Sequence, residues 1–144
     1  MSKKRIKKTD IAKDSTSGIK STKLKPPQSI SFSFKYYQEG NSKFSCSEKE
    51  VIYWLTLLER LKALSSLTAQ ELLVNRSSTL RCHPIKWDDT SERGFGLPNE
   101  EQLVDTPYQF SLSSNEHGRV HGLFINEIFY IVWLDPDHVL YPGK

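Results

Sequence analysis

The sequence predicts an α+β domain in which a helical hairpin packs on a small antiparallel sheet. Three observations support this fold class. An alternating apolar run at residues 30–36 is typical of a strand, two helix-start signals precede apolar stripes within residues 47–74, and three strand-like segments follow residue 107. The chain of 144 residues is long enough for about one such domain.

The first predicted strand alternates apolar and polar side chains. The residues of one face are all apolar or aromatic: Ile30, Phe32, Phe34 and Tyr36. This period of two is typical of a half-buried strand. The polar residues 38–42 predict a turn, after which residues 43–46 are expected to pair back as a short strand.

Two capping boxes predict where the helices begin. In each box a Ser or Thr precedes a Glu by three residues, and the pairs are Ser47 with Glu50 and Thr68 with Glu71. Apolar residues then recur at spacings of three and four. We therefore expect helices near residues 48–64 and 68–74, joined as a hairpin.

Strand signals return in the second half of the chain. Residues 80–87 are short, extended and interrupted by Pro84, and residues 88–106 are expected to form a long loop. The three strand candidates after this loop are residues 108–113, 119–125 and 128–134. Asn126-Glu127 separates the last two closely enough for a hairpin.

Both faces of the last predicted strand are apolar. Strict alternation places Ile128, Tyr130, Val132 and Leu134 on one face, and Phe129, Ile131 and Trp133 on the other. Helices on one side of the sheet leave the second apolar face uncovered. We expect the long loop or a partner to cover part of it.

Positive charge is concentrated at the N-terminus. Residues 1–25 hold nine of the 20 Lys and Arg residues and only Asp10 and Asp14, a net charge of +7, whereas the rest has 11 basic and 15 acidic residues, a net charge of −4. Residues 1–28 therefore predict a basic disordered arm ahead of a domain at residues 29–144. The arm is either a solubilising tail or a segment that binds phosphates.

Several classes of protein do not fit the sequence. No apolar run reaches the length of a spanning helix, and the basic N-terminus has no apolar segment of a secretory signal behind it. Cys46 and Cys82 lack CxxC spacing, and the histidines lack the spacing of a zinc module. No glycine-rich phosphate loop is present. We expect a cytoplasmic protein with reduced thiols that uses no metal or cofactor.

Basic and aromatic residues are the remaining candidates for chemistry. They are Arg81, His83, Lys86, Arg119, His121, His138 and Tyr141. Arg119 and His121 are two residues apart on one predicted strand and so face the same side. Three of these candidates also have a structural interpretation: an ion pair from Arg119 to a loop carboxylate, packing of His83 beside Pro84 and Trp87, or packing of Tyr141 over the sheet edge.

These segments resemble the RelE and HigB toxins. Leu80-Arg81-Cys82-His83-Pro84-Ile85-Lys86 is similar to a Leu-His-Pro-Leu-Lys type segment of HigB proteins. Residues 108–113 and 117–120 resemble a strand–turn–Arg–strand stretch of the family, and residues 128–134 with His138 and Tyr141 resemble its end. The resemblance covers residues 29–142 and implies a RelE-like fold.

The resemblance implies a metal-independent endoribonuclease: a toxin that cuts mRNA, typically in the ribosomal A site, and is silenced by a cognate antitoxin. It assigns phosphate binding to Arg119 and makes His83, His138 and Tyr141 the other catalytic candidates. The predicted RNA-binding residues are Arg81, Lys86, His121, Lys3, Lys4, Arg5, Lys7 and Lys8. The chain departs from the family where RelE has two lysines, because it has Gln109 and Ser111 there.

The residue types suit such a reaction. Cleavage at a 2′-hydroxyl needs a base, an acid and a cation on the phosphate, roles that histidine and arginine perform near neutral pH. Two other hypotheses remain open: a RelE-fold protein without cleavage activity that binds the ribosome or another protein, and an unrelated small α+β binding protein in phage defence.

Overall fold

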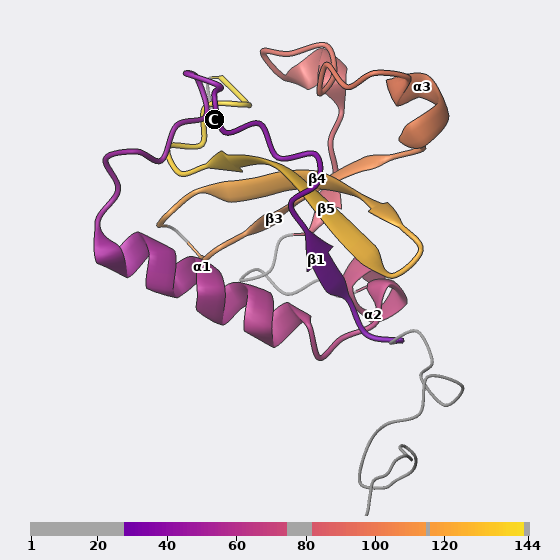
Figure 1. Ribbon diagram of the computed structural model, residues 1–144, viewed down its shortest axis with the longest axis horizontal. Coiled ribbons are helices and arrows are strands. Elements are labelled where there is room, and N and C mark those ends of the chain that lie inside the picture. The colour runs from indigo at the N-terminus through magenta and orange to yellow at the C-terminus, as the bar shows by residue number, and fades with distance from the viewer. Residues whose placement is uncertain (1–27, 75–81, 115, 143–144) are drawn as a thin grey trace, which may run out of the picture.

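The computed structural model describes residues 28–74, 82–114 and 116–142, and confirms the α+β class (Figure 1). Its centre is a five-stranded sheet in the order β1-β5-β4-β3-β2. The strands are β1 (Ser31–Ser33), β2 (His83–Pro84), β3 (Pro107–Ser111), β4 (Arg119–Ile125) and β5 (Ile128–Asp135). Because β1 runs parallel to β5, the prediction of a wholly antiparallel sheet is wrong at that edge.

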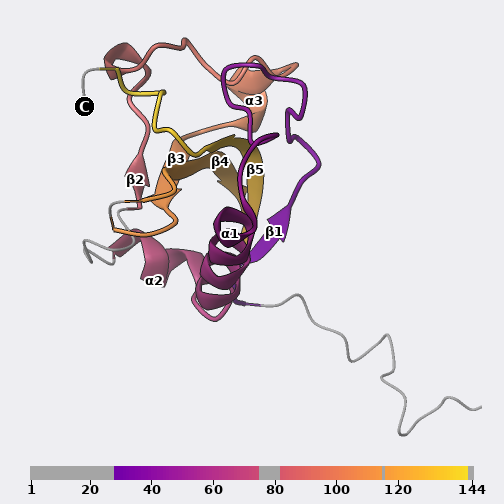
Figure 2. The same cartoon turned by 90° about the vertical axis from the view of Figure 1, so that its left-hand side faces the viewer.

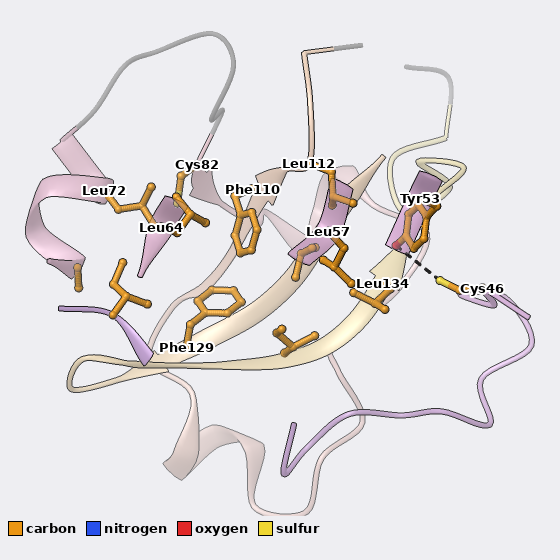
Figure 3. Close-up of a cluster of buried hydrophobic side chains, with 14 residues drawn as sticks. Cys46, Tyr53, Leu57, Leu64, Leu72, Cys82, Phe110, Leu112, Phe129 and Leu134 are labelled. Atoms are coloured by element: carbon orange, nitrogen blue, oxygen red, sulfur yellow. Dashed lines mark hydrogen bonds between the residues drawn. The ribbon is translucent and has the colours of Figure 1, made fainter. Parts of the chain in front are cut away.

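The helical hairpin covers one face of the sheet. Helix α1 (Val51–Leu64) and helix α2 (Ala69–Val74) pack there, and their buried leucines meet aromatic residues of the strands (Figure 3). Leu57, Leu64 and Leu72 contribute from the helices, and Phe110 and Phe129 from β3 and β5. Burial of each such side chain contributes about 1.5–3 kcal/mol. The predicted hairpin is confirmed.

The two capping boxes have different outcomes. Thr68 and Glu71 form theirs, since the Thr68 N–H donates to Glu71 Oε1 at 2.8 Å and the Glu71 N–H donates to Thr68 Oγ1 at 3.0 Å. The box at Ser47 and Glu50 is wrong. Helix α1 begins only at Val51 and Glu50 makes no side-chain cap bond, because the preceding residues form a turn in which the Ser47 hydroxyl pairs with another serine.

The opposite face of the sheet carries a second core. It is covered by the segment that follows β2, which includes a 3-10 helix, η3 (Trp87–Asp89), and helix α3 (Glu100–Leu103). Trp133 of β5 lies at its centre, stacked on Phe44 at 4.3 Å and edge-on to Phe95 at 5.0 Å. The predicted long loop is thus a packed layer with two short helices, and Figure 2 shows the sheet between it and α1.

Phe44 lies in a segment that the sequence predicts to be a short strand. Residues 43–46 form no strand, because Phe44 instead turns into the second core, where it is 3% exposed. The polar neighbours of Phe44 are held by side-chain bonds: Asn41 Oδ1 accepts from the Lys43 N–H at 2.9 Å. Residues 43–46 thus bury the ring of Phe44 and do not pair back as a strand.

A bulge in β5 changes which side chains face which side. His121 pairs with Trp133 and Gly122 with Ile131, so Val132 is an extra residue without a partner in β4. Leu134 therefore joins the helical core, whereas Val132 and Trp133 both join the second core. The predicted strict alternation is wrong beyond Val132, because Trp133 and Leu134 lie on the faces opposite to those predicted.

Residues 1–27, nearly all of the predicted basic arm, lie outside the described residues. Within the described ranges, no helix has the length and apolar character needed to cross a membrane.

Candidate functional site

An open pocket of about 630 Å³ lies where the N-terminal end of β4 meets the chain that leaves β5. We call it the polar pocket. Its walls come from strands β2 and β3, from the turn between β3 and β4 with the first residue of β4, and from the turn after β5. The lining residues are His83, Gln109, Ser113, Ser114, Glu116, His117, Gly118, Arg119, Pro136, Asp137, His138 and Tyr141.

The register of the sheet explains why polar side chains gather here. His83 lies opposite Gln109, which lies opposite His121 on β4. One step along, Arg119 lies between Ser111 on β3 and Asp135 on β5. Directly paired residues share a face, so these two rows form a polar lattice that continues from the second core.

Gln109 links two candidates across the strands. Its Oε1 accepts from Arg119 Nη1 at 3.4 Å, and its Nε2 lies 3.4 Å from His83 Nδ1. The backbone carbonyl of Pro84 also lies 3.3 Å from His83 Nδ1. The amide suits a deprotonated Nδ1 and the carbonyl suits a protonated one. His83 thus has a partner for Nδ1 in either protonation state.

A buried carboxylate fixes the turn after β5. Asp135 Oδ2 accepts from His121 Nε2 at 2.9 Å and from the Leu140 N–H at 3.0 Å, and its Oδ1 accepts from the Val139 N–H at 2.8 Å. These bonds tie β4 to the turn that presents His138. Asp135 is therefore the residue that determines the position of one pocket wall.

The electrostatics of this buried pair favour a charged Asp135 beside a neutral His121. Burial lowers the pKa of His121, opposed by its hydrogen bond to Asp135. Burial by itself raises the pKa of Asp135, but the bond from His121 and those from the Val139 and Leu140 N–H groups outweigh it, and this pKa is lowered. Nε2 of His121 therefore carries the donated proton.

Two buried polar atoms of these rows lack hydrogen-bond partners within the described residues: Ser111 Oγ and His121 Nδ1. Leaving such an atom unsatisfied costs about 1–3 kcal/mol. Apolar side chains in place of Ser111 and His121 would not carry this free-energy cost. Stability of the fold therefore does not explain why polar residues occupy these two rows. Buried polar atoms without partners are instead typical of a functional region.

The turn after β5 also carries strain. His138 adopts a left-handed conformation with φ of 57°, which is uncommon for a residue other than glycine. Its ring lies 6.4 Å from the ring of Tyr141, whose hydroxyl accepts from the Lys86 N–H at 3.3 Å. The Tyr141 hydroxyl proton therefore remains available for donation.

The structure brings together the four residues predicted to be catalytic. His83, Arg119, His138 and Tyr141 all line the polar pocket. His83 is exposed, although its Nδ1 lies 3.3 Å from the carbonyl oxygen of its neighbour Pro84.

The predicted RNA-binding residues are not brought together in this way. His121 is fully buried, so the expectation that it contacts RNA is wrong, because the Asp135 bond and the second core enclose its ring. The Lys86 side chain lines a separate hollow with Trp87, Asp88 and Asp89. Arg81 and the arm residues Lys3, Lys4, Arg5, Lys7 and Lys8 lie outside the described residues.

Sequence reasoning missed several residues of the site. In the sequence, Gln109 and Ser111 are only departures from the RelE pattern, and no motif marks Asp135. The available signal was the position of Gln109 and Ser111 on the same face of one strand, beside Arg119 on the next. Glu116 and Asp137 add two carboxylates to the pocket wall, of which Asp137 pairs with Lys49 at 3.0 Å.

Within the described residues, no group of three or more His, Cys, Asp or Glu side chains is arranged to hold a metal ion. Comparisons of the chain with protein-family models, with curated proteins and with solved structures found no match.

Proposed function

We propose that this protein is a RelE-like endoribonuclease, the toxin of a toxin–antitoxin pair, and that the polar pocket binds the scissile phosphate of RNA. The observation that carries the proposal is the convergence of His83, Arg119, His138 and Tyr141, from distant parts of the chain, on one pocket. The element order supports it, because a strand, a helical hairpin and an antiparallel meander match what the resemblance implies.

The proposed reaction uses only side chains of this chain. Arg119, oriented by Gln109, binds the phosphate and stabilises the charge that develops on it. His83 and His138 move the two protons, one from the attacking 2′-hydroxyl and one to the leaving 5′-oxygen. Tyr141 stacks on a base or donates its hydroxyl proton. We propose a cytoplasmic toxin that acts on ribosome-bound mRNA and is neutralised by an antitoxin protein.

The test is RNA cleavage by the full-length chain in the presence of a metal chelator, with and without ribosomes. Arg119→Ala is expected to reduce the rate by about 10²–10³, as for loss of a charge-stabilising donor. His83→Ala and His138→Ala are expected to reduce it by about 10²–10⁴. Arg93→Ala is the matched control, because Arg93 is exposed and lines a different hollow. Melting temperatures are measured on the same preparations.

The outcomes separate this function from its alternatives. Normal cleavage by all three well-folded pocket variants contradicts the proposed site. A lower melting temperature with unchanged activity per folded molecule indicates that Arg119, His83 and His138 only support the fold.

A second candidate is an RNA-binding protein without cleavage activity. Gln109 and Ser111 stand where RelE has lysines, and Glu116 and Asp137 place carboxylates at the pocket, so its positive charge is reduced. RNA binding that weakens in Arg119→Ala, with no cleavage by the wild-type chain, favours this candidate.

A further inference from the structure

Helix α1 has a second apolar stripe that faces away from the sheet. The side chains of this outer stripe and their exposed fractions are Val51 72%, Trp54 38%, Leu55 51% and Leu58 61%. Their spacing of three, four and seven residues places them on one side of the helix. The buried residues Tyr53, Leu57 and Leu64 occupy the opposite side.

An outer stripe of this kind needs an explanation. A surface helix usually has one apolar side and one polar side, and contiguous exposed apolar patches on folded proteins mark interaction surfaces. No other described element covers the outer side of α1, which runs along the outside of the molecule (Figures 1 and 2). Ile52, 59% exposed, extends the patch at its N-terminal end.

The charges at the two ends of the stripe are complementary. Glu48 and Glu50 are exposed just before α1, and Lys62 is exposed in its last turn, four residues beyond Leu58. The nearby cation Lys49 is held by Asp137 at 3.0 Å. Two copies of α1 packed antiparallel therefore place Lys62 of each copy near the acidic end of the other. Their helix dipoles are then also antiparallel.

We propose that this chain forms a two-fold symmetric dimer through antiparallel packing of the outer stripes of α1. The contact is isologous, so each apolar side chain and each charged end is used twice. One helix face is small beside the interfaces of specific, stable complexes, which bury about 800 Å² per partner, and permanent dimers bury more. The dimer is therefore reversible, and it does not depend on RNA cleavage.

The first test is sedimentation equilibrium of the full-length chain over a concentration series. Wild type is expected to show a monomer–dimer equilibrium, and Leu58→Lys to raise the dissociation constant about tenfold or more, because it places a charge in an apolar contact. Val74→Lys is the matched control, since Val74 is 66% exposed on α2 outside the stripe. Circular dichroism confirms that the variants fold.

A charge exchange tests the antiparallel arrangement. Lys62→Glu and the double variant Glu48→Lys/Glu50→Lys are each expected to self-associate more weakly, because like charges then meet at both ends. A mixture of the Lys62→Glu variant and the double variant brings opposite charges together at both ends of the helix pair. The mixture is therefore expected to form the dimer again. A wild-type chain that stays monomeric at its highest soluble concentration overturns the proposal and leaves the stripe to another protein. Equal weakening by Val74→Lys, or failure of the mixture to associate, also overturns it.

Discussion

His121 Nε2 and Asp135 Oδ2 lie 2.9 Å apart, and both side chains are completely buried. The pair joins the middle of β4 to the end of β5, next to the polar pocket, because the sheet pairs His121 with Gln109 and Asp135 with Arg119, which both line it. Asp135 also accepts two backbone N–H groups from the turn that carries His138, so this one residue connects the sheet to the pocket wall.

The first prediction concerns the stability of the fold at acidic pH. The folded-state pKa of His121 is lowered, so below about pH 6.5 the unfolded chain binds a proton that the folded chain does not. The free energy of unfolding should therefore fall as the pH falls below that value. The lowered pKa of Asp135 adds a further loss below about pH 4. Denaturant unfolding between about pH 7.5 and about pH 5 measures the first effect, and a flat curve contradicts it.

The second prediction compares two aspartates in the same segment. Asp135→Ala removes a charged acceptor that receives bonds from His121 and from two backbone N–H groups. It is expected to lower the free energy of unfolding by about 3 kcal/mol or more, because each hydrogen bond to a charged group contributes about 1.5–3 kcal/mol. Asp137→Ala removes an exposed ion pair with Lys49 and is expected to cost less than about 1 kcal/mol. Hydrogen exchange at Val139 and Leu140 should accelerate only in the first variant. Equal losses in the two variants contradict the anchoring role of Asp135.

Local patterns predicted much of this fold. The hairpin followed from apolar spacing and from the Thr68–Glu71 box, and the last two strands were predicted almost to the residue, since β4 is Arg119–Ile125 and β5 is Ile128–Asp135. These elements satisfy their preferences within a few residues of chain, which is what periodicity records.

The parts that sequence did not predict depend on distant contacts. The parallel pairing of β1 with β5 and the turning of Phe44 into the second core join segments far apart in the chain. The bulge at Val132 moves Asp135 to the face of the sheet opposite the helices, where it pairs with His121. Strict alternation places Asp135 on the helical face, so the sequence pattern does not predict this pair. The resemblance selected four residues that do line the pocket, whereas His121 was misplaced, because its burial depends on the second core.

The third prediction tests the close approach of two turns. Gly118 has a positive φ of 68°, and an added Cβ would lie 1.9 Å from the backbone oxygen of Asp135. Gly118→Ala is therefore expected to destabilise the chain by more than about 1 kcal/mol and to displace the turn that carries His138. Gly40→Ala is the control, because a Cβ there meets nothing within 4 Å. Chemical unfolding of both variants measures the difference, and equal stability contradicts the steric argument.

The last prediction concerns the basic N-terminus, which lies outside the described residues. Replacement of Lys3, Lys4, Arg5, Lys7 and Lys8 by Ala is expected to weaken RNA binding and to flatten its salt dependence, by about 0.7 in the logarithmic slope for each phosphate that the arm no longer neutralises. The cleavage rate at saturating RNA should not change, because the proposed chemistry belongs to the polar pocket. Arg93→Ala is the single-charge control. Binding measured over a salt series distinguishes the two interpretations of the arm, since an unchanged slope in the arm variant leaves it as a solubilising tail.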